Sequence, residues 1–390
     1  MNKIKVGFLL NLSYSWMGEV NYIKSLLISI KKFESHSIHP IIFFPENIDG
    51  KLRKEFEILA EVNTTSLLSK GSINYIIWRA TRKIFNTDKY VEIVLRNFKL
   101  DIFSHSTLIG LGNTKTLNWI PDFQHLRLPQ MFNKNEIILR NKSILNLLNK
   151  SDRILLSSKD AQQDLIENFG FKYKQKVDVI EFVSIIEKYA KYEKNDIEYI
   201  KSKYNIPQKY FLLPNQFWKH KNHLLVFEAL SILNNKGLDI SLVCTGLLDD
   251  YRNKDYAISI LNFIKETGID VKMLGLINYQ DLILLIKSSI AVINPSLFEG
   301  WSTIVEECKT LGKNLIISDI PIHREQNPEH VIFFNPYKAN KLADILESVF
   351  ANQNEYLHLY DEDEYYNYNN LRQKEFIIKY KNTLLKTINK

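Results

Sequence analysis

Two glutamates, Glu299 and Glu307, lie eight positions apart where the sequence pattern changes from strand to loop to helix. The apolar run at 291–294 is typical of a buried strand, and a helical pattern begins near Ser302. Free N–H groups and the dipole at a helix start attract phosphate. Carboxylates accept hydrogen bonds from the vicinal hydroxyls of a sugar or a ribose. The segment therefore predicts a sugar-nucleotide site, and a solvated helix face is the alternative.

The residues from Glu299 to Glu307 are Glu-Gly-Trp-Ser-Thr-Ile-Val-Glu-Glu, and they resemble the signature of retaining family-four glycosyltransferases with the GT-B fold. The segment at 312–326 is similar to a bacterial branch of that family. The resemblance implies that Glu299 positions the donor sugar and that Glu307 binds the ribose. It also implies donor contacts from five residues between them: Gly300, Trp301, Ser302, Thr303 and Ile304.

A basic loop, Pro-Asn-Gln-Phe-Trp-Lys-His-Lys at 214–221, follows an expected strand. Family members carry Gly-Arg, four residues and then Lys here, and those cations neutralise the donor diphosphate as the glycosidic bond breaks. By this resemblance Lys221 stabilises the leaving group, whereas Gln216 stands where Arg is usual. Lys219 or His220 is the alternative source of charge, and a solvated basic loop is the alternative to any binding role.

In the N-terminal half, Trp-Ile-Pro-Asp-Phe-Gln-His ends at His125 and is similar to a segment of the same bacterial branch. Many broader family members have His-Asp here, with the His facing the donor sugar. Pro121 replaces that His and Asp122 matches the Asp, so we assign the active-site role to His125, with a structural histidine as the alternative. Gly18, in a loop expected after the first strand, and Gly275 complete the predicted donor site.

Short apolar runs alternate with helical patterns along the chain, as in parallel α/β sheets that bind ligands at the strand carboxyl ends. The first series of expected strands is Lys5–Leu10, His39–Phe44, Asp101–His105, Leu117–Ile120, Arg153–Ser157 and Val177–Phe182. The second series is Tyr210–Leu213, Ile240–Thr245, Val271–Leu274, Ile290–Asn294, Asn314–Ser318 and Val331–Phe334. The resemblance implies the GT-B arrangement, in which two doubly wound Rossmann-like domains face a central cleft.

A chain of 390 residues suits two domains. We expect an N-terminal acceptor-side domain at 1–186 and a donor-binding domain at 187–370. The Tyr- and Asn-rich tract at 361–370 is expected to be a loop. A final helix at 371–390 is expected to pack back on the N-terminal domain, as the family resemblance implies.

Charge is unevenly distributed: residues 1–180 contain 26 Lys and Arg against 17 Asp and Glu, and the remainder contains 25 against 27. In a helix expected at 74–85, one apolar stripe comprises Ile77, Ala80, Thr81 and Ile84. An adjoining interfacial face comprises Trp78, Arg79, Arg82 and Lys83. These features predict peripheral contact with an anionic membrane. A helix packed inside its own domain is the alternative. Nucleic acid is not an expected partner, because no motif that recognises RNA or DNA accompanies these charges.

The sequence has no run of 18 apolar residues and no signal-peptide cleavage pattern at its start, so we expect a cytoplasmic protein, at most peripheral on the inner face of the membrane. Its two cysteines, Cys244 and Cys308, are in separate segments and predict neither a disulfide nor a metal site. We expect no cofactor and no required metal, only a nucleotide-sugar donor.

Together these observations predict a retaining glycosyltransferase that moves a hexose from a nucleoside diphosphate sugar to a glycan or lipid-linked glycan in bacterial surface polysaccharide synthesis. One alternative is a catalytically silent donor-binding subunit of a heteromeric transferase, which the Gln216 and Pro121 departures favour. Another is a sugar-nucleotide epimerase with the same two-domain fold. The base, the sugar and the acceptor hydroxyl are not specified by these motifs.

Overall fold

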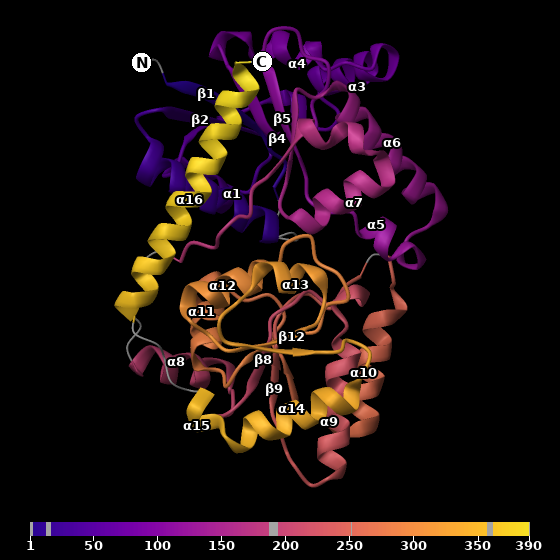
Figure 1. Ribbon diagram of the computed structural model, residues 1–390, viewed down its shortest axis with the longest axis vertical. Coiled ribbons are helices and arrows are strands. Elements are labelled where there is room, and N and C mark those ends of the chain that lie inside the picture. The colour runs from indigo at the N-terminus through magenta and orange to yellow at the C-terminus, as the bar shows by residue number, and fades with distance from the viewer. Residues whose placement is uncertain (1–2, 13–16, 187–193, 251, 357–361, 390) are drawn as a thin grey trace. The chain divides into compact units, whose positions relative to one another are not determined.

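The computed structural model describes residues 3–12, 17–186, 194–250, 252–356 and 362–389 (Figure 1). Contacts divide the chain into two compact units. The first unit comprises 1–123, 134–184 and 370–390, and the second comprises 124–133 and 185–369. The short segment 124–133 therefore contacts the second unit more than the first, although the sequence placed it inside the N-terminal domain. The rest of the predicted domain division stays a prediction.

The first unit is built on a seven-stranded parallel sheet with the order β3-β2-β1-β4-β5-β6-β7. Its strands are β1 (Ile4–Leu9), β2 (Ile38–Phe44), β3 (Glu61–Thr64), β4 (Ile102–Ser106), β5 (Lys115–Ile120), β6 (Arg153–Leu156) and β7 (Val177–Val179). Consecutive residues Val6, Gly7 and Phe8 are all buried, which shows that both faces of the sheet are covered.

The helices of the first unit are α1 (Met17–Ser29), α2 (Gly50–Glu57), α3 (Ile73–Phe85), α4 (Lys89–Leu95), α6 (Lys134–Lys150) and α7 (Lys159–Phe169). Three of these helices begin at a polar side chain that accepts hydrogen bonds from backbone amides, namely Asp49, Ser72 and Ser158. The Ser72 hydroxyl accepts a hydrogen bond from the Tyr75 amide at the start of α3, and Asn86 ends that helix in the left-handed conformation. These local signals fix where α3 begins and ends.

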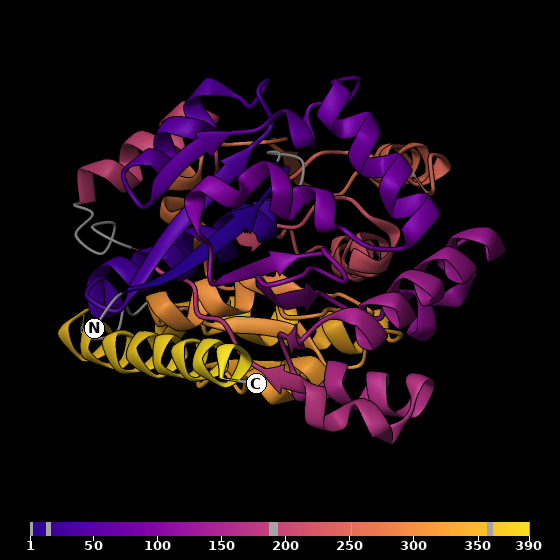
Figure 2. The same ribbon diagram turned by 90° about the horizontal axis from the view of Figure 1, so that it is seen from above.

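A long C-terminal helix, α16 (Glu362–Ile388), completes the first unit with its residues from Asn370 onward (Figure 2). Tyr380 donates a hydrogen bond to the Ser104 hydroxyl of β4 at 2.9 Å. Lys379 pairs with Glu181 at 2.8 Å. Four apolar side chains on this helix are buried: Phe376, Ile377, Tyr380 and Leu384. The end of the chain is thus part of the first unit's core.

The second unit has a six-stranded parallel sheet with the order β10-β9-β8-β11-β12-β13. Its strands are β8 (Phe211–Leu213), β9 (Leu242–Cys244), β10 (Val271–Met273), β11 (Val292–Asn294), β12 (Leu315–Ser318) and β13 (Val331–Phe334). Phe211 and Leu213 belong to one apolar cluster, and Leu212 belongs to another. Successive residues of β8 therefore enter the cores on opposite faces of the sheet.

The helices of the second unit alternate with its strands. They are α5 (Gln124–Arg127), α8 (Lys194–Tyr204), α9 (His223–Asn235), α10 (Asp255–Thr267), α11 (Tyr279–Ser288), α12 (Thr303–Leu311), α13 (Pro321–Gln326), α14 (Ala339–Ala351) and α15 (Gln353–Tyr356). Chain order runs outward from β8 to β10 on one side and from β11 to β13 on the other. The adjacent strands β8 and β11 thus form the topological switch point, where open α/β sheets bind ligands.

The predicted fold class, two Rossmann-like parallel sheets, is confirmed, and three local predictions are wrong. β3 was missed because Glu-Val-Asn-Thr lacks an apolar run and lies at the sheet edge. The loop expected at 361–370 is helical from Glu362, since Tyr and Asn side chains here pack or bond within α16 and its neighbours. Gly18 lies in the first turn of α1 rather than in a loop, and Ser15 and Trp16 before it lie outside the described residues.

Candidate active site

A buried ion pair joins the two loops that leave the switch point. Lys221 ends a 3-10 turn (Lys219–Lys221) after β8, and Glu299 lies in the loop after β11. The Lys221 Nζ lies 2.6 Å from Glu299 Oε1 and 2.8 Å from Oε2. The two side chains are only 15% and 9% exposed. The structure therefore brings together the two residues predicted to contact the leaving diphosphate and the donor sugar.

Neighbouring groups hold this pair in place. The Ser296 hydroxyl donates to Glu299 Oε1 at 2.6 Å, and the Leu297 amide donates to the His220 carbonyl at 2.8 Å. Burial raises the pKa of the Glu299 carboxyl, but the Lys221 ammonium and the Ser296 hydroxyl outweigh burial and keep that pKa below its ordinary value. Glu299 is therefore ionised at neutral pH and poorly suited to act as a base.

Two buried histidines flank Lys221 in the sequence. Burial, with a smaller contribution from the Lys221 charge, lowers the pKa of His220 well below its ordinary value. Burial lowers the pKa of His223 to about 3. Both imidazoles are neutral at pH 7, so His220 supplies no positive charge to this loop. Lys219 is exposed, and its backbone amide donates to the Asp250 carboxylate at 2.9 Å.

Gln216, which stands where family members carry Arg, fastens the loop after β9. Its Oε1 accepts a hydrogen bond from the Leu247 amide at 2.7 Å. The preceding Gly246 has a φ of +113°, and an added Cβ would lie 2.4 Å from the Asn215 carbonyl oxygen. The Gly246 amide also donates to the carbonyl of Gly275 at 2.8 Å. Gln216 and Gly275 thus both bind the loop after β9, where Gly246 lies close to the Asn215 backbone. Their contacts with a donor stay a prediction.

Asn294, the last residue of β11, connects the site loops and was missed by the sequence analysis. Its Oδ1 accepts from Asn215 Nδ2 at 3.2 Å and lies 2.7 Å from the Ser296 hydroxyl oxygen. Its Nδ2 donates to the Ser302 hydroxyl at 2.9 Å. A polar residue that ends an otherwise apolar strand was the available sequence signal. Asn294 bridges the loop that carries Glu299 to the start of α12.

The start of α12 has an unusual cap. Ser302 is the N-cap residue, but its hydroxyl makes no capping bond to the helix. Gln326 instead holds the Ser302 backbone, donating to its carbonyl at 3.0 Å and accepting from its amide at 3.2 Å. Within the described part of the chain, the first-turn amides at Thr303 and Ile304 therefore receive no cap from this side chain. Such a helix start suits an anionic group.

Two adjacent glutamates of α12 are both buried. Glu306 is enclosed by protein groups, accepting from Gln326 Nε2 at 3.0 Å and pairing with Lys309 at 3.4 Å. Glu307, the predicted ribose ligand, is buried one position further along. Gly300 and Trp301 are half-buried in the loop before the helix. Glu306 is therefore a structural carboxylate, and the ribose contact of Glu307 stays a prediction.

His125 lies in α5, inside the segment 124–133 that belongs to the second unit. It is fully buried, and its ring meets the edge of Phe132 with centroids 6.3 Å apart. Gln124 accepts a hydrogen bond from Arg252 Nη1 at 3.2 Å. The segment that carries His125 is therefore fastened to the unit that carries Lys221 and Glu299, whereas Gly18 belongs to the first unit.

Arg252 is the second residue that the sequence analysis missed. Its guanidinium lies 4.7 Å from the centroid of the Phe132 ring and 5.8 Å from that of Trp218. Trp218 in turn lies next to His220, with ring centroids 5.6 Å apart. No local motif surrounds Arg252 in the sequence, so only the three-dimensional structure identifies it. Arg252 links the basic loop after β8 to the His125 segment.

We expect Arg252→Ala to loosen the segment 124–133. A desolvated cation–π contact contributes on the order of 2 kcal/mol, so amide hydrogen exchange in this segment should accelerate roughly 30-fold. The matched control is Arg324→Ala, which removes another cation–π contact, 3.7 Å from the Phe333 ring, and should leave exchange in 124–133 unchanged. Unchanged exchange in the Arg252 variant would refute this positioning role.

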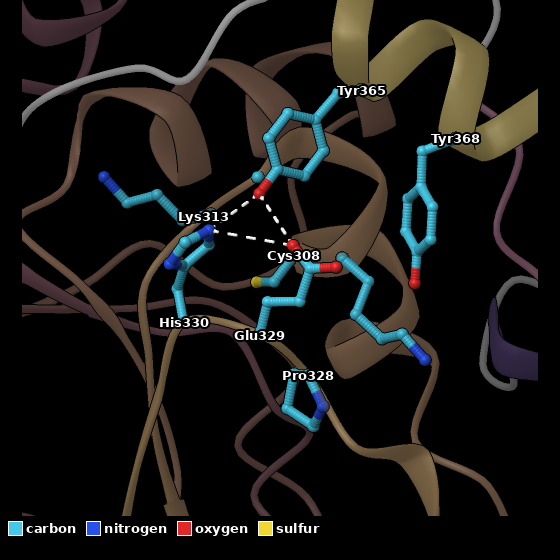
Figure 3. A pocket seen from close by; sticks show the side chains of 9 residues that line it. Cys308, Lys313, Pro328, Glu329, His330, Tyr365 and Tyr368 are labelled. Atoms are coloured by element: carbon cyan, nitrogen blue, oxygen red, sulfur yellow. Dashed lines mark hydrogen bonds and ion pairs between the residues drawn. The ribbon is translucent and has the colours of Figure 1, made fainter.

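A separate, small pocket lies at the other end of α12 (Figure 3). The Tyr365 hydroxyl and His330 Nε2 are hydrogen-bonded there at 2.7 Å. An added Cβ at Gly312 would lie 2.8 Å from the Tyr365 ring, so only glycine fits beneath the start of α16. This pocket contains none of the predicted donor-site residues. Its contacts explain why the chain is helical so early in the 361–370 tract.

Among the residues that the structure describes, no three His, Cys, Asp or Glu side chains are grouped so that they could hold a metal ion. Within the same residues, no helix combines the length and apolar character needed to cross a bilayer.

The chain is similar to known proteins in sequence and in structure. Residues 196–365 match the family model described as glycosyl transferases group 1. Over 196 residues the chain is 26% identical to the O-antigen chain mannosyltransferase RfbU of Salmonella typhimurium strain LT2. That match covers 47% of this chain and 50% of RfbU, so it spans about half the length of this curated relative.

Two solved structures share the fold over nearly the whole chain. A glycosyltransferase from Rickettsia africae superposes with a TM-score of 0.68 at 18% identity and covers 100% of both chains. Anabaena HepE in complex with UDP and glucose superposes with a TM-score of 0.72 at 14% identity, covering 98% of this chain and 100% of HepE. The protein therefore has the GT-B fold, and its second unit is similar to the glycosyl transferases group 1 model over residues 196–365.

Proposed function

We propose that this protein is a retaining glycosyltransferase that transfers a hexose from a nucleoside diphosphate sugar to a glycan or lipid-linked glycan in bacterial surface polysaccharide synthesis. The observation that carries the proposal is the buried Lys221–Glu299 pair at the switch point. The RfbU match supports a surface glycan as product, and the HepE likeness supports a nucleotide-sugar donor. The identity of the hexose and of the nucleotide base is left open.

The opposite charges of Lys221 and Glu299 suit them to different parts of the donor. Lys221 and Glu299 neutralise each other, and an ammonium has three N–H donors. Lys221 can therefore donate to a phosphate oxygen and still keep a bond to Glu299. Glu299 in turn accepts hydrogen bonds from sugar hydroxyls. Negative charge on the diphosphate grows as it departs, so the Lys221 interaction strengthens toward the transition state.

The reaction that we propose breaks the bond between the anomeric carbon and the diphosphate oxygen and forms one to the acceptor oxygen on the same face. The acceptor's hydroxyl proton passes to the departing diphosphate. Glu299 has a pKa below its ordinary value and does not take this proton. Amides at the start of α12 receive the phosphates, and His125 contacts the donor sugar. Because Lys221 meets the leaving group, the reaction should not need a metal.

The direct test is to incubate the protein with a panel of sugar nucleotides and to follow diphosphate release, with and without glycan acceptors. Release from one donor, unaffected by EDTA and stimulated by an acceptor, is expected. Configuration at the anomeric carbon of the product, read by NMR, should match that of the donor. Loss of release in EDTA that added metal restores would contradict the metal-independent mechanism.

A silent donor-binding subunit is the second candidate, because Gln216 is used to bind the Leu247 amide rather than supplying a cation. Such a subunit would bind one sugar nucleotide tightly but release no diphosphate with any acceptor. Calorimetric donor binding without turnover would therefore favour this candidate. Turnover in the panel would exclude it.

We expect Glu307→Ala to weaken donor binding more than it slows the reaction. A ribose contact is similar in the ground and transition states, so its loss acts on affinity. A lost hydrogen bond to a charged group costs about 1.5–3 kcal/mol, which raises the donor Kd by roughly 10–150-fold. Glu266→Ala, at an exposed position on α10, is the matched control. An unchanged Kd in a folded Glu307 variant would remove the ribose assignment.

A further inference from the structure

Helix α3 of the first unit exposes an aliphatic stripe to solvent. Ile73 is 75% exposed, Ile76 57% and Ile84 71%, and Ile77 and Ala80 between them are also exposed. Spacings of three, four, seven and eleven residues place these side chains on one face of a helix. Burying such a face within the same unit would be the ordinary arrangement. Here the stripe is exposed to solvent instead.

The opposite face of α3 is the one that anchors the helix. Trp78 is 6% exposed, and its Nε1 donates to Asp88 at 2.6 Å. Arg82 pairs with Asp88 at 3.1 Å and donates to the Thr107 carbonyl at 3.0 Å. The prediction that Trp78 and Arg82 line an interfacial face is therefore wrong, because a buried carboxylate draws both toward the core. The outward face consists of the isoleucines instead.

The surroundings of this stripe are positively charged. Residues 66–99 contain seven Lys and Arg against two acidic residues, Asp88 and Glu92. Asp88 is buried with the partners named above, and Glu92 accepts three backbone hydrogen bonds at 2.7 Å from residues 112–114. Arg79 and Lys83 are exposed beside the isoleucines. Both acids are thus engaged by partners of their own, while exposed cations border the stripe.

A second helix of the first unit, α6, also exposes aliphatic side chains. On α6, Ile138 and Leu139 are exposed, and so are Leu145 and the intervening Lys142. Lys150 at the end of α6 donates to the Asn86 carbonyl at the end of α3, at 2.6 Å. The two helices that expose aliphatic side chains are therefore joined at their ends.

We propose that the α3 stripe docks this protein on an anionic lipid bilayer. Apolar side chains bordered by cations fit the boundary between lipid headgroups and acyl chains. There the burial of apolar surface and the attraction to anionic headgroups both favour binding. A second copy of the chain would bring an equally positive face, so charge disfavours self-association through the stripe. The proposal goes beyond the transfer reaction, in which no residue of the α3 stripe is given a role.

Vesicle co-sedimentation tests the proposal with the full-length chain. The wild type should bind vesicles of phosphatidylcholine with 30% phosphatidylglycerol and should lose binding as salt increases. Arg79→Gln/Lys83→Gln should weaken binding about 30-fold, since each basic residue near the surface contributes roughly fivefold. The charge-matched control, Lys338→Gln/Lys341→Gln, alters exposed residues of the second unit and should bind like the wild type.

The contribution of the α3 isoleucines to vesicle binding is tested separately. Ile76→Asn/Ile84→Asn should reduce binding at least tenfold, whereas Ile258→Asn, at a 58% exposed site on α10, should not. Equal binding to neutral and anionic vesicles, or full binding by the stripe variant, would overturn the proposal. A concentration-dependent dimer that disappears in the stripe variant would assign the surface to a second copy instead. Donor turnover in solution should be normal in all these variants, which separates this result from the proposed reaction.

Discussion

Lys221→Met is expected to lower kcat by about 100–1,000-fold, which corresponds to roughly 2.7–4 kcal/mol for one preorganised electrostatic donor. The ammonium is held by both oxygens of Glu299 at the switch point, so it is already ordered before any donor arrives. The diphosphate gains charge as it leaves, and therefore the loss should appear in kcat more than in donor affinity. Steady-state and single-turnover kinetics measure the two effects separately.

Removing Lys221 alone also leaves Glu299 buried without its cation, so stability must be separated from catalysis. The double variant Lys221→Met/Glu299→Gln replaces the ion pair by two neutral groups and should regain most of the stability that the single variant loses. It should stay inactive. Lys219→Met, at the exposed neighbour, serves as the charge-matched control. A kcat within about twofold of wild type in Lys221→Met would shift the leaving-group role to Lys219.

Glu299→Ala is expected to reduce the free energy of unfolding by about 3–5 kcal/mol, because it strands a buried ammonium without its partner. Urea denaturation at pH 7 measures this loss. The pKa of Glu299 is held below its ordinary value of 4.5 in the folded protein. The stabilisation is therefore fully present above pH 4.5 and is lost as pH falls through the folded value, so the difference between variant and wild type should shrink in acid.

A surface ion pair provides the comparison for this loss. Lys236 and Glu347 lie 2.7 Å apart but are 46% and 42% exposed. Glu347→Ala should therefore cost less than about 1 kcal/mol, because water screens exposed pairs. Equal losses in the two variants would mean that burial does not distinguish the Lys221–Glu299 pair, and would weaken the argument for a preorganised site.

The proximity of Lys221 and Glu299 could be predicted from the sequence, because the loops that follow parallel strands all lie at the same edge of the sheet. Lys221 and Glu299 are 78 residues apart, yet each follows a strand next to the switch point, and the ion pair follows from that topology. Asn294 and Arg252 could not be predicted in the same way. Their partners come from loops whose mutual approach depends on single backbone positions such as Gly246.

Amphipathic patterns also limited what could be predicted from the sequence. The period of α3 indicated a two-sided helix but not which side faces the core. Asp88, three residues beyond the end of the helix, decides this, because a buried carboxylate needs Trp78 and Arg82 as donors. In β3, alternation was too weak to detect, since no residue of this edge strand is buried.

The assignment of 124–133 to the second unit affects how proteins with this fold can be recombined. A chimera built by exchanging residues 185–369 would insert a new Arg252 and Trp218 opposite the old Gln124 and Phe132. The exchanged half would then meet a foreign α5, and His125 would be supplied by the recipient chain. Exchanging the proposed donor site between two such proteins therefore requires transplanting two separate stretches of the gene, because one structural unit is encoded in two pieces.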